Sequence, residues 1–540
     1  MPTAVVKAFD GLKPITDPVL LGPGGATVAK NLRLVSGAVQ PVQNSTVLKA
    51  CTKTLPKTIF RYGSSNDPTE HWLEFLDDTD VMRSPIIDNQ YGMLYWTDGV
   101  EPRYAPNSLI VSGSSYPGAS YKLGLPAPVG KPELSGTTPT AASKSITLTA
   151  VYTYVTAYGE EGPPSPAADV ITIDPESTIA ISGISAAPTG AYNVTMKRIY
   201  LSSTVGSSAK FQFWKEIPVA TTSTTGTYVQ ADLGELLPSE DWVAPPAGLK
   251  GIKAMANGIA VGFVENTVYL SEPNLPHAWP HQYPVDHKII GIGTFGQTAV
   301  ILTEGFPYLL TGADPAAMSL DRLKQQQSCL SKPSIAETAE GVAYSSPDGL
   351  VVISPAGVNV ITRELMSKQQ WQSYNPSSMR GAVYDNRYHC FYTKTDGTRG
   401  LMIFDFTGQG AVMVEHDAHT ATAVTAVHTD PRTDTMYMAQ GGNIVSFDTG
   451  SNMTFTWRSK TYRLPFSINF GVGQVIADTY PVTMKVYADG VLKLTKTVTD
   501  NNVFRLTSGF RAMDWQFQVE ASTKVTFAGI STSVEEMRGT

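Results

Sequence analysis

One arrangement recurs through the second half of the sequence: a Gly or Asn turn, an apolar strand, a second turn and another apolar strand. Strand pairs of this kind occupy residues 258–270, 298–310, 341–353, 388–404 and 435–447. Their second strands recur roughly every 40 to 50 residues, which is the length of a β-propeller blade. The repeat therefore predicts a propeller, and it points to a scaffold rather than to a catalyst.

Length and composition favour several β-rich domains. The 540 residues exceed what one hydrophobic core usually serves, so we expect about two to four domains. Only 16% of the residues are charged, and the 46 Gly and 37 Pro fit a turn-rich all-β chain. Low charge leaves much neutral surface that can be buried against partners.

Charge and cysteine content argue against several classes of function. The net charge of −7 provides no general basic surface for DNA phosphates, so we expect DNA to pass rather than to bind. Cys51, Cys329 and Cys390 form no CxxC pair, which favours reduced assembly in a cytoplasm over a disulfide framework. The start at Met1 does not resemble a signal peptide, and no run of about 18 apolar residues occurs, so neither export nor a membrane span is expected.

The first 125 residues divide into two segments. Residues 1–45 are rich in Pro and Gly and have little core of their own, so we expect an extended N-terminal arm or edge segment. Residues 46–125 contain strand-like runs at 58–62, 71–76 and 92–97, separated by turn residues. These runs predict a first blade and the first part of the propeller.

Two Pro-rich linkers, 125–132 and 243–248, bracket an inserted domain at 126–247. Strands are expected at 146–154, 170–173, 179–181, 194–201 and 211–217. About seven short strands in this length predict a sandwich. Residues 197–203 and 227–232 resemble the late strands of fibronectin type III modules, which implies a fibronectin type III/Ig-like domain.

The remainder of the propeller is expected at 248–452 and a separate C-terminal β-domain at 453–540, where the blade spacing breaks. One helix is predicted at 314–327, because Asp314 and Pro315 suit an N-cap and first helical position. The predicted fold is therefore all-β: a propeller interrupted by a sandwich and followed by a C-terminal β-domain.

Three histidines in a Pro-rich stretch suggest a metal site at first sight. His277, His281 and His287 are four and six residues apart, and imidazoles at such spacing can bind a metal. Prolines interleaved with them forbid a helix that would place the first two on one face. We therefore favour a loop whose Trp279 and Tyr283 fill a crevice between blades.

Two further groups of titratable residues are candidate sites. His416, Asp417 and His419 offer acid–base chemistry, but no nucleophile is tied to them by spacing, so a turn at a blade edge is expected. An acidic run consists of Glu70, Glu74, Asp77, Asp78 and Asp80. This run lacks the glycine and terminal glutamate of an EF-hand loop, so we expect solvated or channel-facing carboxylates around a buried strand rather than a calcium site.

The Gly-rich segment 22–27 resembles a phosphate-binding loop only superficially. It has no Gly-Lys-Ser/Thr ending and is not expected to join a buried strand to a helix. No GxSxG motif occurs, and paired glycosidase carboxylates cannot be located from one sequence. We assign no catalytic, cofactor-binding or metal-binding residue and expect no enzyme activity.

Several short motifs, taken in order, resemble virion structural proteins of tailed bacteriophages. They are GLKPITDP (11–18), AKNLRLVSGAVQP (29–41), YKLGLPAP (121–128), WVAPP (242–246), VYLSEP with PHAWP (268–280), and VFRL (503–506). Within that group the sequence is most similar to the tail nozzle, or tail-hub, protein of short-tailed phages. The similarity spans most of the chain through scattered short motifs.

This resemblance implies a subunit of a ring in the virion tail, assembled in the host cytoplasm. The ring is expected to be a homohexamer below the portal and adaptor rings, with tail fibre or needle proteins as further partners. Its lumen would retain packaged double-stranded DNA and later conduct it without sequence-specific binding. We expect ring contacts from the propeller and the C-terminal domain, with the sandwich projecting outward.

Two other functions remain open at this point. A tail protein that binds a receptor or degrades host glycans would also be β-rich, and propellers do host glycosidases. A secreted adhesin with a fibronectin-like domain fits less well, because no export signal is recognised.

Overall fold

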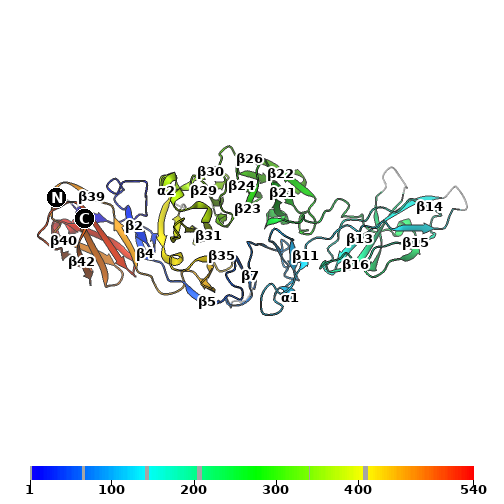
Figure 1. Ribbon diagram of the computed structural model, residues 1–540, viewed down its shortest axis with the longest axis horizontal. Helices are drawn as coiled ribbons and strands as arrows, with labels where there is room; N and C mark the ends of the chain where they lie inside the picture. Colours follow the sequence, from blue (N-terminus) through cyan, green and yellow to red (C-terminus); the bar gives the residue numbers. More distant parts are fainter. Residues whose placement is uncertain are drawn as a thin grey trace. The chain divides into compact units, whose positions relative to one another are not determined.

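The computed structural model describes residues 3–63, 67–139, 145–203, 210–339, 341–405 and 411–539; Met1 and Pro2, part of the start discussed above, lie outside this set. The chain forms two compact units (Figure 1). Unit 1 contains Met1–Asp77, Val300–Tyr308 and Arg322–Thr540, and unit 2 contains Asp78–Ala299 and Leu309–Asp321. Within the described ranges, no helix combines the length and apolarity needed to cross a membrane.

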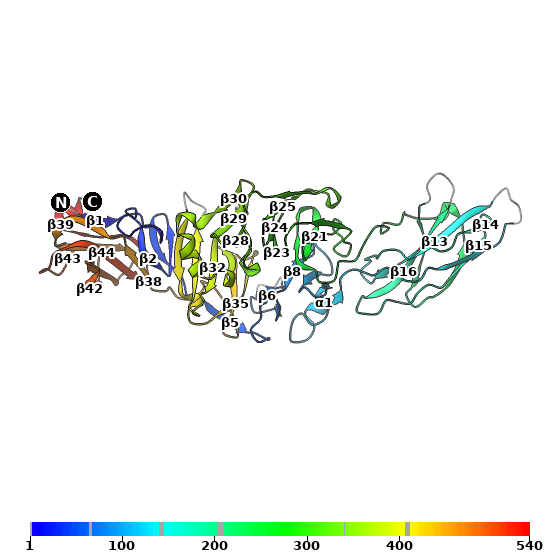
Figure 2. The same cartoon turned by 45° about the horizontal axis from the view of Figure 1, so that its top comes forward.

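Among the described residues, six runs of four paired strands have the form of propeller blades (Figure 2). The first three runs are β8 (Asp80–Arg83), β9 (Leu94–Thr97), β10 (Arg103–Ala105) and β11 (Tyr121–Lys122); β19 (Lys250–Ala254), β20 (Ala260–Val264), β21 (Thr267–Leu270) and β22 (His281–Pro284); and β23 (Ile289–Phe295), β24 (Thr298–Thr303), β25 (Tyr308–Thr311) and β26 (Ser319–Arg322). The other three are β27 (Ala336–Thr338), β28 (Gly341–Ser345), β29 (Leu350–Ser354) and β30 (Gly357–Val360); β31 (Arg380–Tyr384), β32 (Arg387–Thr393), β33 (Arg399–Asp405) and β34 (Val412–His416); and β35 (Val424–Asp430), β36 (Thr435–Gln440), β37 (Asn443–Ser446) and β5 (Thr46–Ala50).

The five strand pairs predicted from the repeat are confirmed as the two middle strands of five of these runs. They are β20–β21, β24–β25, β28–β29, β32–β33 and β36–β37. Most residues of these strands are buried, and in β28 every one of them is. A strand covered on both faces has a nearly continuous apolar sequence, which makes it visible to a pattern analysis.

The first strands of successive runs pack against one another, as in a propeller. In unit 1, β27 packs against β31 and β31 against β35; in unit 2, β8 packs against β19 and β19 against β23. The last run is completed by β5, a strand from near the start of the chain, which pairs with β37 through Thr46 and Ser446. The fold is all-β: a propeller interrupted by an inserted sandwich and followed by a C-terminal β-domain.

The prediction of which strands form the first blade is wrong. The runs at 58–62 and 71–76 form a separate two-stranded sheet, β6 (Thr58–Arg61) and β7 (Trp72–Phe75), in unit 1. The third run is β9, which belongs to the four-stranded sheet of β8–β11 in unit 2. The hairpin differs because β6 packs against β35 and its side chains join that blade.

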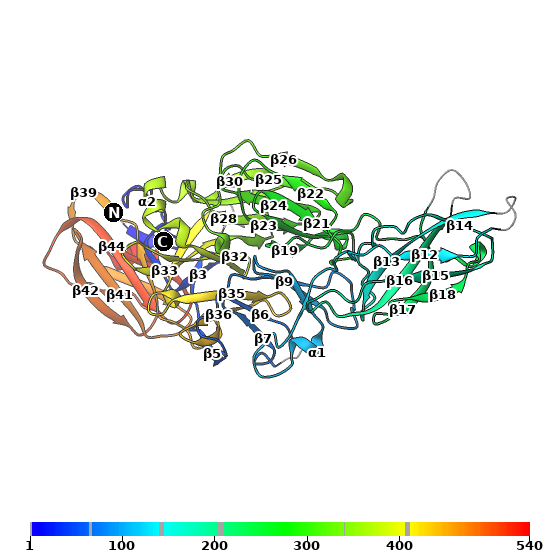
Figure 3. The same cartoon turned by 45° about the vertical axis from the view of Figure 1, so that its right-hand side comes forward.

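The described part of the inserted domain contains seven strands in two sheets (Figure 3). They are β12 (Glu133–Gly136), β15 (Thr178–Ser182) and β18 (Thr224–Thr227) in one sheet, and β14 (Ile171–Ile173), β13 (Ile146–Thr156), β16 (Val194–Ser203) and β17 (Gln212–Pro218) in the other. Buried side chains from both sheets, including Tyr152, Ile179 and Ile199, form one core. The last predicted strand ends early, because residues 230–232 form a single 3-10 turn.

Residues 1–45 are not an extended arm, and the C-terminal β-domain is not separate from them. Strand β1 (Thr3–Val6) pairs with β45 (Val525–Ser531), and β2 (Ala26–Lys30) pairs with β38 (Phe455–Ser459). The hairpin of β3 (Leu32–Val35) and β4 (Ala38–Pro41) also reaches β45. Figures 1 and 2 show both chain ends at this domain. Ala4, Val6, Ala29, Leu32 and Val39 complete its core, which explains why the segment has no core of its own.

The helix predicted at 314–327 is also wrong. Asp314 does accept a hydrogen bond from the N–H of Ala316 at 2.9 Å, and Pro315 follows it, so the expected N-cap is present. The turn that it caps ends at Ala317, and the chain then extends as β26, the fourth strand of its sheet. Pairing of β26 with the sheet outweighs the local helical pattern.

Candidate functional site

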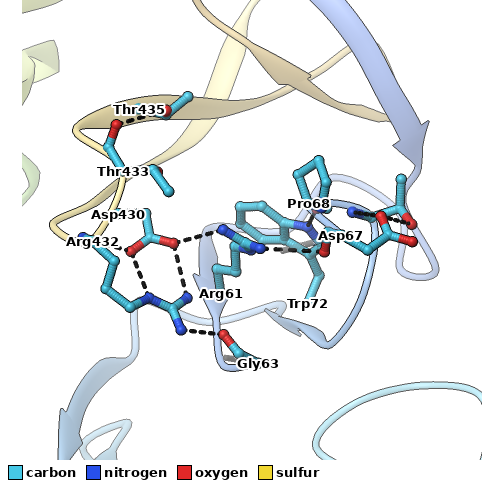
Figure 4. Close-up of polar contacts among 10 residues, drawn as sticks. Arg61, Gly63, Asp67, Pro68, Trp72, Asp430, Arg432, Thr433 and Thr435 are labelled. Carbon is cyan, nitrogen blue, oxygen red and sulfur yellow. Dashed lines mark hydrogen bonds and ion pairs between the residues drawn. The ribbon is translucent and has the colours of Figure 1, made fainter. Parts of the chain in front are cut away.

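A buried ion cluster joins the β6–β7 hairpin to the blade of β35–β37 and β5 (Figure 4). Asp430 is the last residue of β35, and its carboxylate accepts hydrogen bonds from two guanidinium groups. Arg61 donates from Nη1 to Asp430 Oδ2 at 2.9 Å, and Arg432 donates from Nε and Nη2 at 3.0 and 2.9 Å. Asp430 Oδ1 also accepts the backbone N–H of Arg432 at 3.0 Å. We call Arg61, Asp430 and Arg432 the ion latch.

The ion latch also contacts the backbone of Gly63 and Asp67, between β6 and β7. Arg61 donates from Nη2 to the carbonyl of Asp67 at 3.2 Å. Arg432 donates from Nη1 to the carbonyl of Gly63 (Figure 4). Trp72 of β7 lies beside the latch and packs edge-on against Tyr437 of β36, with ring centroids 4.9 Å apart. Ionic and aromatic contacts therefore fix the same hairpin.

Two members of the latch are almost inaccessible to water, whereas Arg432 is partly exposed. The Arg61 and Asp430 side chains are 4% and 1% exposed. Burial alone would raise the pKa of Asp430, but hydrogen bonds and charge from Arg432, with a further hydrogen bond from Arg61, lower that pKa well below its ordinary value. A buried charge is tolerated only when it is paired and hydrogen-bonded, and this carboxylate has both. Its chemistry is that of a structural clamp.

Sequence reasoning missed the latch. Arg61 and Asp430 are 369 residues apart, so no local spacing reveals the pair. The available signal was the Asp430-Pro431-Arg432 turn, in which a carboxylate and a cation flank a proline. That signal indicates a turn, but it does not indicate its partner.

The acidic run of the N-terminal half is only partly solvated. Glu74 of β7 is fully buried, contrary to the expectation of solvated or channel-facing carboxylates. Its carboxylate accepts the backbone N–H groups of Thr52 and Lys53 at 3.0 and 2.8 Å, which compensates for the burial. Asp80 accepts the N–H of Gly251 at 2.8 Å. The remaining members, Glu70, Asp77 and Asp78, are exposed.

His416, Asp417 and His419 lie in and beside a 3-10 turn, η7 (Asp417–His419), directly after β34. The Nδ1 atoms of both histidines accept backbone N–H groups at 2.9 Å. Asp417 forms an ion pair with Lys30 of β2 at 2.7 Å and accepts a hydrogen bond from Asn31 at 2.8 Å. Burial lowers the pKa of each histidine to about 4, so both are neutral at pH 7. The two histidines stabilise the turn through its backbone, and Asp417 ties the turn to the N-terminal segment.

His277, His281 and His287 lie in different environments. His281 Nε2 lies 2.9 Å from a carboxylate oxygen of Glu272, whereas His277 is buried and His287 is exposed. Trp279 fills the space between the sheets of β8–β11 and β19–β22. Across the described ranges, no group of three or more His, Cys, Asp or Glu side chains is placed to hold a metal ion.

The Gly-rich segment 22–27 forms a tight turn that leads into a strand. The N–H of Gly25 donates to the carbonyl of Gly22 at 3.0 Å, and β2 begins at Ala26. Because a strand follows the turn, the segment does not present a helix N-terminus to a phosphate.

Two hollows flank Arg33 of β3 in unit 1. The larger is an open cleft of about 560 Å³. It is lined by Arg33, Gln40, Pro41, Gln43, Asp448, Asn452, Asp478, Thr523 and Lys524. Arg33 pairs with Asp448 at the wall of this cleft. The smaller hollow measures about 30 Å³ and is lined by side chains such as Leu34 and Phe447, so it has room for about one or two water molecules.

No family model matches the sequence, and no curated protein matches it either. Similar solved structures include the extracellular domain of a hybrid two-component system from B. thetaiotaomicron, with 9% identity over 63% of this chain and a TM-score of 0.27. This chain covers 42% of that protein's chain. Hsv2 from Kluyvelomyces marxianus is 7% identical over 49% of this chain and 69% of its own, with a TM-score of 0.26. BamB from Moraxella catarrhalis is 10% identical over 61% of this chain and 93% of its own, with a TM-score of 0.26. These distant likenesses carry no information about function.

Proposed function

We propose that this protein is a virion structural protein, a subunit of the ring-shaped tail nozzle of a short-tailed bacteriophage. In this role it lies below the portal and adaptor rings, retains packaged DNA and conducts it during ejection. The observation that carries the proposal is the sequence resemblance to tail nozzle proteins, whose motifs recur in order along most of the chain. The resemblance implies a subunit that bears a β-propeller, and the propeller-like blades of this chain are consistent with it.

The internal contacts support a mechanical rather than a catalytic role. The ion latch clamps a hairpin to its blade, and the paired Lys30 and Asp417 tie the N-terminal segment to a second blade. A subunit that retains DNA under load needs such cross-connections between distant parts of its sequence. The titratable groups described above serve these contacts.

The charge balance supports passage of DNA rather than tight binding. With a net charge of −7, the protein has no overall attraction for a polyanion. A conduit benefits from this balance, because a strongly basic lumen would hold the phosphates and slow ejection.

Ring formation is the first test of the proposal. The propeller and the C-terminal β-domain make the lateral contacts in this proposal, and a head-to-tail contact closes into a ring when its rotation permits. Mass photometry of the purified protein is expected to show one closed oligomer, a hexamer of the 58.1 kDa chain. Sedimentation velocity that shows only monomers at micromolar concentration, both alone and with portal and adaptor proteins, would contradict the proposal.

The inserted sandwich is expected to be dispensable for the ring. Removing residues 130–245 leaves the blades and the C-terminal β-domain, so the same oligomer is expected by mass photometry. A shift of that variant to monomers, with the full chain still oligomeric, would assign the ring contacts to the sandwich instead.

A tail protein that binds or degrades host glycans is the second candidate. The polar cleft beside Arg33 favours it, because amide and carboxylate side chains such as Gln40 and Asp478 suit a hydrated polar ligand. A turnover assay on host polysaccharide separates the two functions. Release of oligosaccharides by the wild type, lost on substitution of Asp478 by Asn, would favour the glycan-degrading role over the nozzle.

A further inference from the structure

One turn of the inserted sandwich contacts the blade region of the same unit. The turn follows β13, and Gly159 adopts a left-handed φ of 81° that favours glycine. Gly162 packs so closely that an added Cβ would lie 2.7 Å from the Leu125 side chain of the first linker. Between these glycines, Glu160 and Glu161 have different partners, and they link the sandwich to the blade.

Glu161 belongs to the sandwich. Its carboxylate accepts hydrogen bonds from Thr153 Oγ1 and Tyr200 Oη, each at 2.7 Å, and from Arg198 Nη1 at 2.9 Å. The guanidinium balances its charge, so Glu161 anchors the turn firmly to strands β13 and β16. The position of its neighbour Glu160 is fixed as a consequence.

Glu160 lies among aromatic side chains instead. Thr156 Oγ1 donates a hydrogen bond to its Oε2 atom at 3.3 Å, and Tyr104 of β10 is a titratable neighbour. Tyr95 of β9 and Tyr158 of the turn are the other titratable groups that it influences. In the part of the chain that the structure describes, no Lys or Arg side chain forms an ion pair with Glu160.

The remaining titratable neighbour is His277, in the loop between β21 and β22. Its Nδ1 atom lies 4.0 Å from Glu160 Oε1, and the residue is 7% exposed. The ring packs edge-on against Trp242, with centroids 5.6 Å apart. Its Nε2 atom has no hydrogen-bond partner among the described residues. A largely buried acid and a buried base therefore lie near each other where sandwich and blade meet.

We propose that Glu160 and His277 form an acid–base pair whose opposed protonation keeps the inserted sandwich attached to its blade over the acidic to neutral range. Between about pH 4 and 7, Glu160 is protonated and His277 is neutral, so the pair holds one proton and carries no charge. Neither group then needs a counter-ion at this largely buried site.

The pH dependence of the two residues supports this compensation. Burial raises the pKa of Glu160 to about 7 from 4.5, so its contribution to attachment is full below pH 4.5 and is lost as pH rises through 7. Burial lowers the pKa of His277 to about 4 from 6.5, so its contribution is full above pH 6.5 and is lost as pH falls through 4. Between pH 4.5 and 6.5 the two dependences oppose each other and cancel.

Hydrogen exchange of the full-length protein tests the pair. The protection of amides in residues 93–105 and 156–162 is measured from pH 4 to 8, with correction for the intrinsic exchange rate. Wild type is expected to be nearly flat between pH 4.5 and 6.5. Glu160→Gln is expected to lose protection as pH falls from 6.5, approaching about tenfold per pH unit. His277→Asn is expected to lose protection as pH rises from 4.5, with a similar slope.

The double variant and a surface control separate this role from simple packing. Glu160→Gln combined with His277→Asn removes both titrations, so its profile is expected to be flat at a lower level of protection. Glu265→Gln, on an exposed turn of the same unit, is expected to match wild type. Parallel profiles in wild type and both single variants, or slopes of the same sign in the two, would overturn the proposal. If one single variant does not fold, the sign of the pH slope of protection in the other variant still tests the proposal.

Discussion

At the scale of single residues, buried charges in this protein are matched by specific partners. Asp430 is matched by two guanidinium groups, Glu74 by two backbone N–H groups, and Glu161 by Arg198 and two hydroxyls. Each arrangement supplies the hydrogen bonds that the side chain loses on leaving water. Because the partners lie on other strands or loops, these residues tie elements together.

Asp430→Asn is expected to release the β6–β7 hairpin. The substitution leaves the Arg61 guanidinium buried without its anion, which costs about 3 kcal/mol. Native-state hydrogen exchange of the amides in β6 and β7 measures the free energy of this local opening. The exposed residue Asp241 provides the matched control, and Asp241→Asn is expected to change the same value by less than about 0.5 kcal/mol. Equal values for the two variants would show that the latch does not hold the hairpin.

The latch is also expected to weaken in acid. The pKa of Asp430 is lowered in the folded protein from 3.8, so its contribution is full above pH 3.8 and is lost as pH falls through the folded value. The difference in hairpin protection between wild type and Asp430→Asn is therefore expected to be constant from pH 7 to about pH 4 and to shrink below it. A difference that changes between pH 5 and 7 would point to another titrating group.

At the scale of elements, the local sequence pattern predicts a strand or helix correctly only where local interactions determine that element. The middle strands of the blades, such as β28 and β32, were predicted correctly because both faces are buried and turns flank them. The helix expected after Asp314 fails because pairing in a sheet overrides the local signal. The segment 1–45 was misread because its strands pair with β38 and β45, more than 400 residues away.

A chain that lacks residues 3–45 provides a test of the N-terminal strands. Loss of β1, β2 and the β3–β4 hairpin uncovers the core around Trp457 and Ile530, so the C-terminal β-domain is expected to lose its protection from hydrogen exchange. The inserted sandwich, whose core contains no residue of this segment, is the internal control and is expected to keep its protection. An unchanged C-terminal β-domain would restore the interpretation of residues 1–45 as an arm.

At the scale of the whole molecule, several sheets are completed by strands that lie far apart in the sequence. Strand β5 completes a blade with β37, and β1 and β2 complete the C-terminal β-domain. The modules themselves could be predicted from composition shifts and strand spacing. The strand pairings that complete these sheets could not be predicted, because they depend on which sheet edges, distant in sequence, meet in the folded protein. The ion latch and the Glu160–His277 pair belong to the same class of long-range contacts, and sequence reasoning found neither arrangement.

The central claim is that copies of this chain form a ring in the virion tail. Negative-stain electron microscopy of the purified protein and of virion tails tests it most directly. The account predicts closed rings with an open lumen in the purified protein and a matching ring at the tail position below the portal. Images that show only single particles in the purified protein and no such ring in the virion would contradict it.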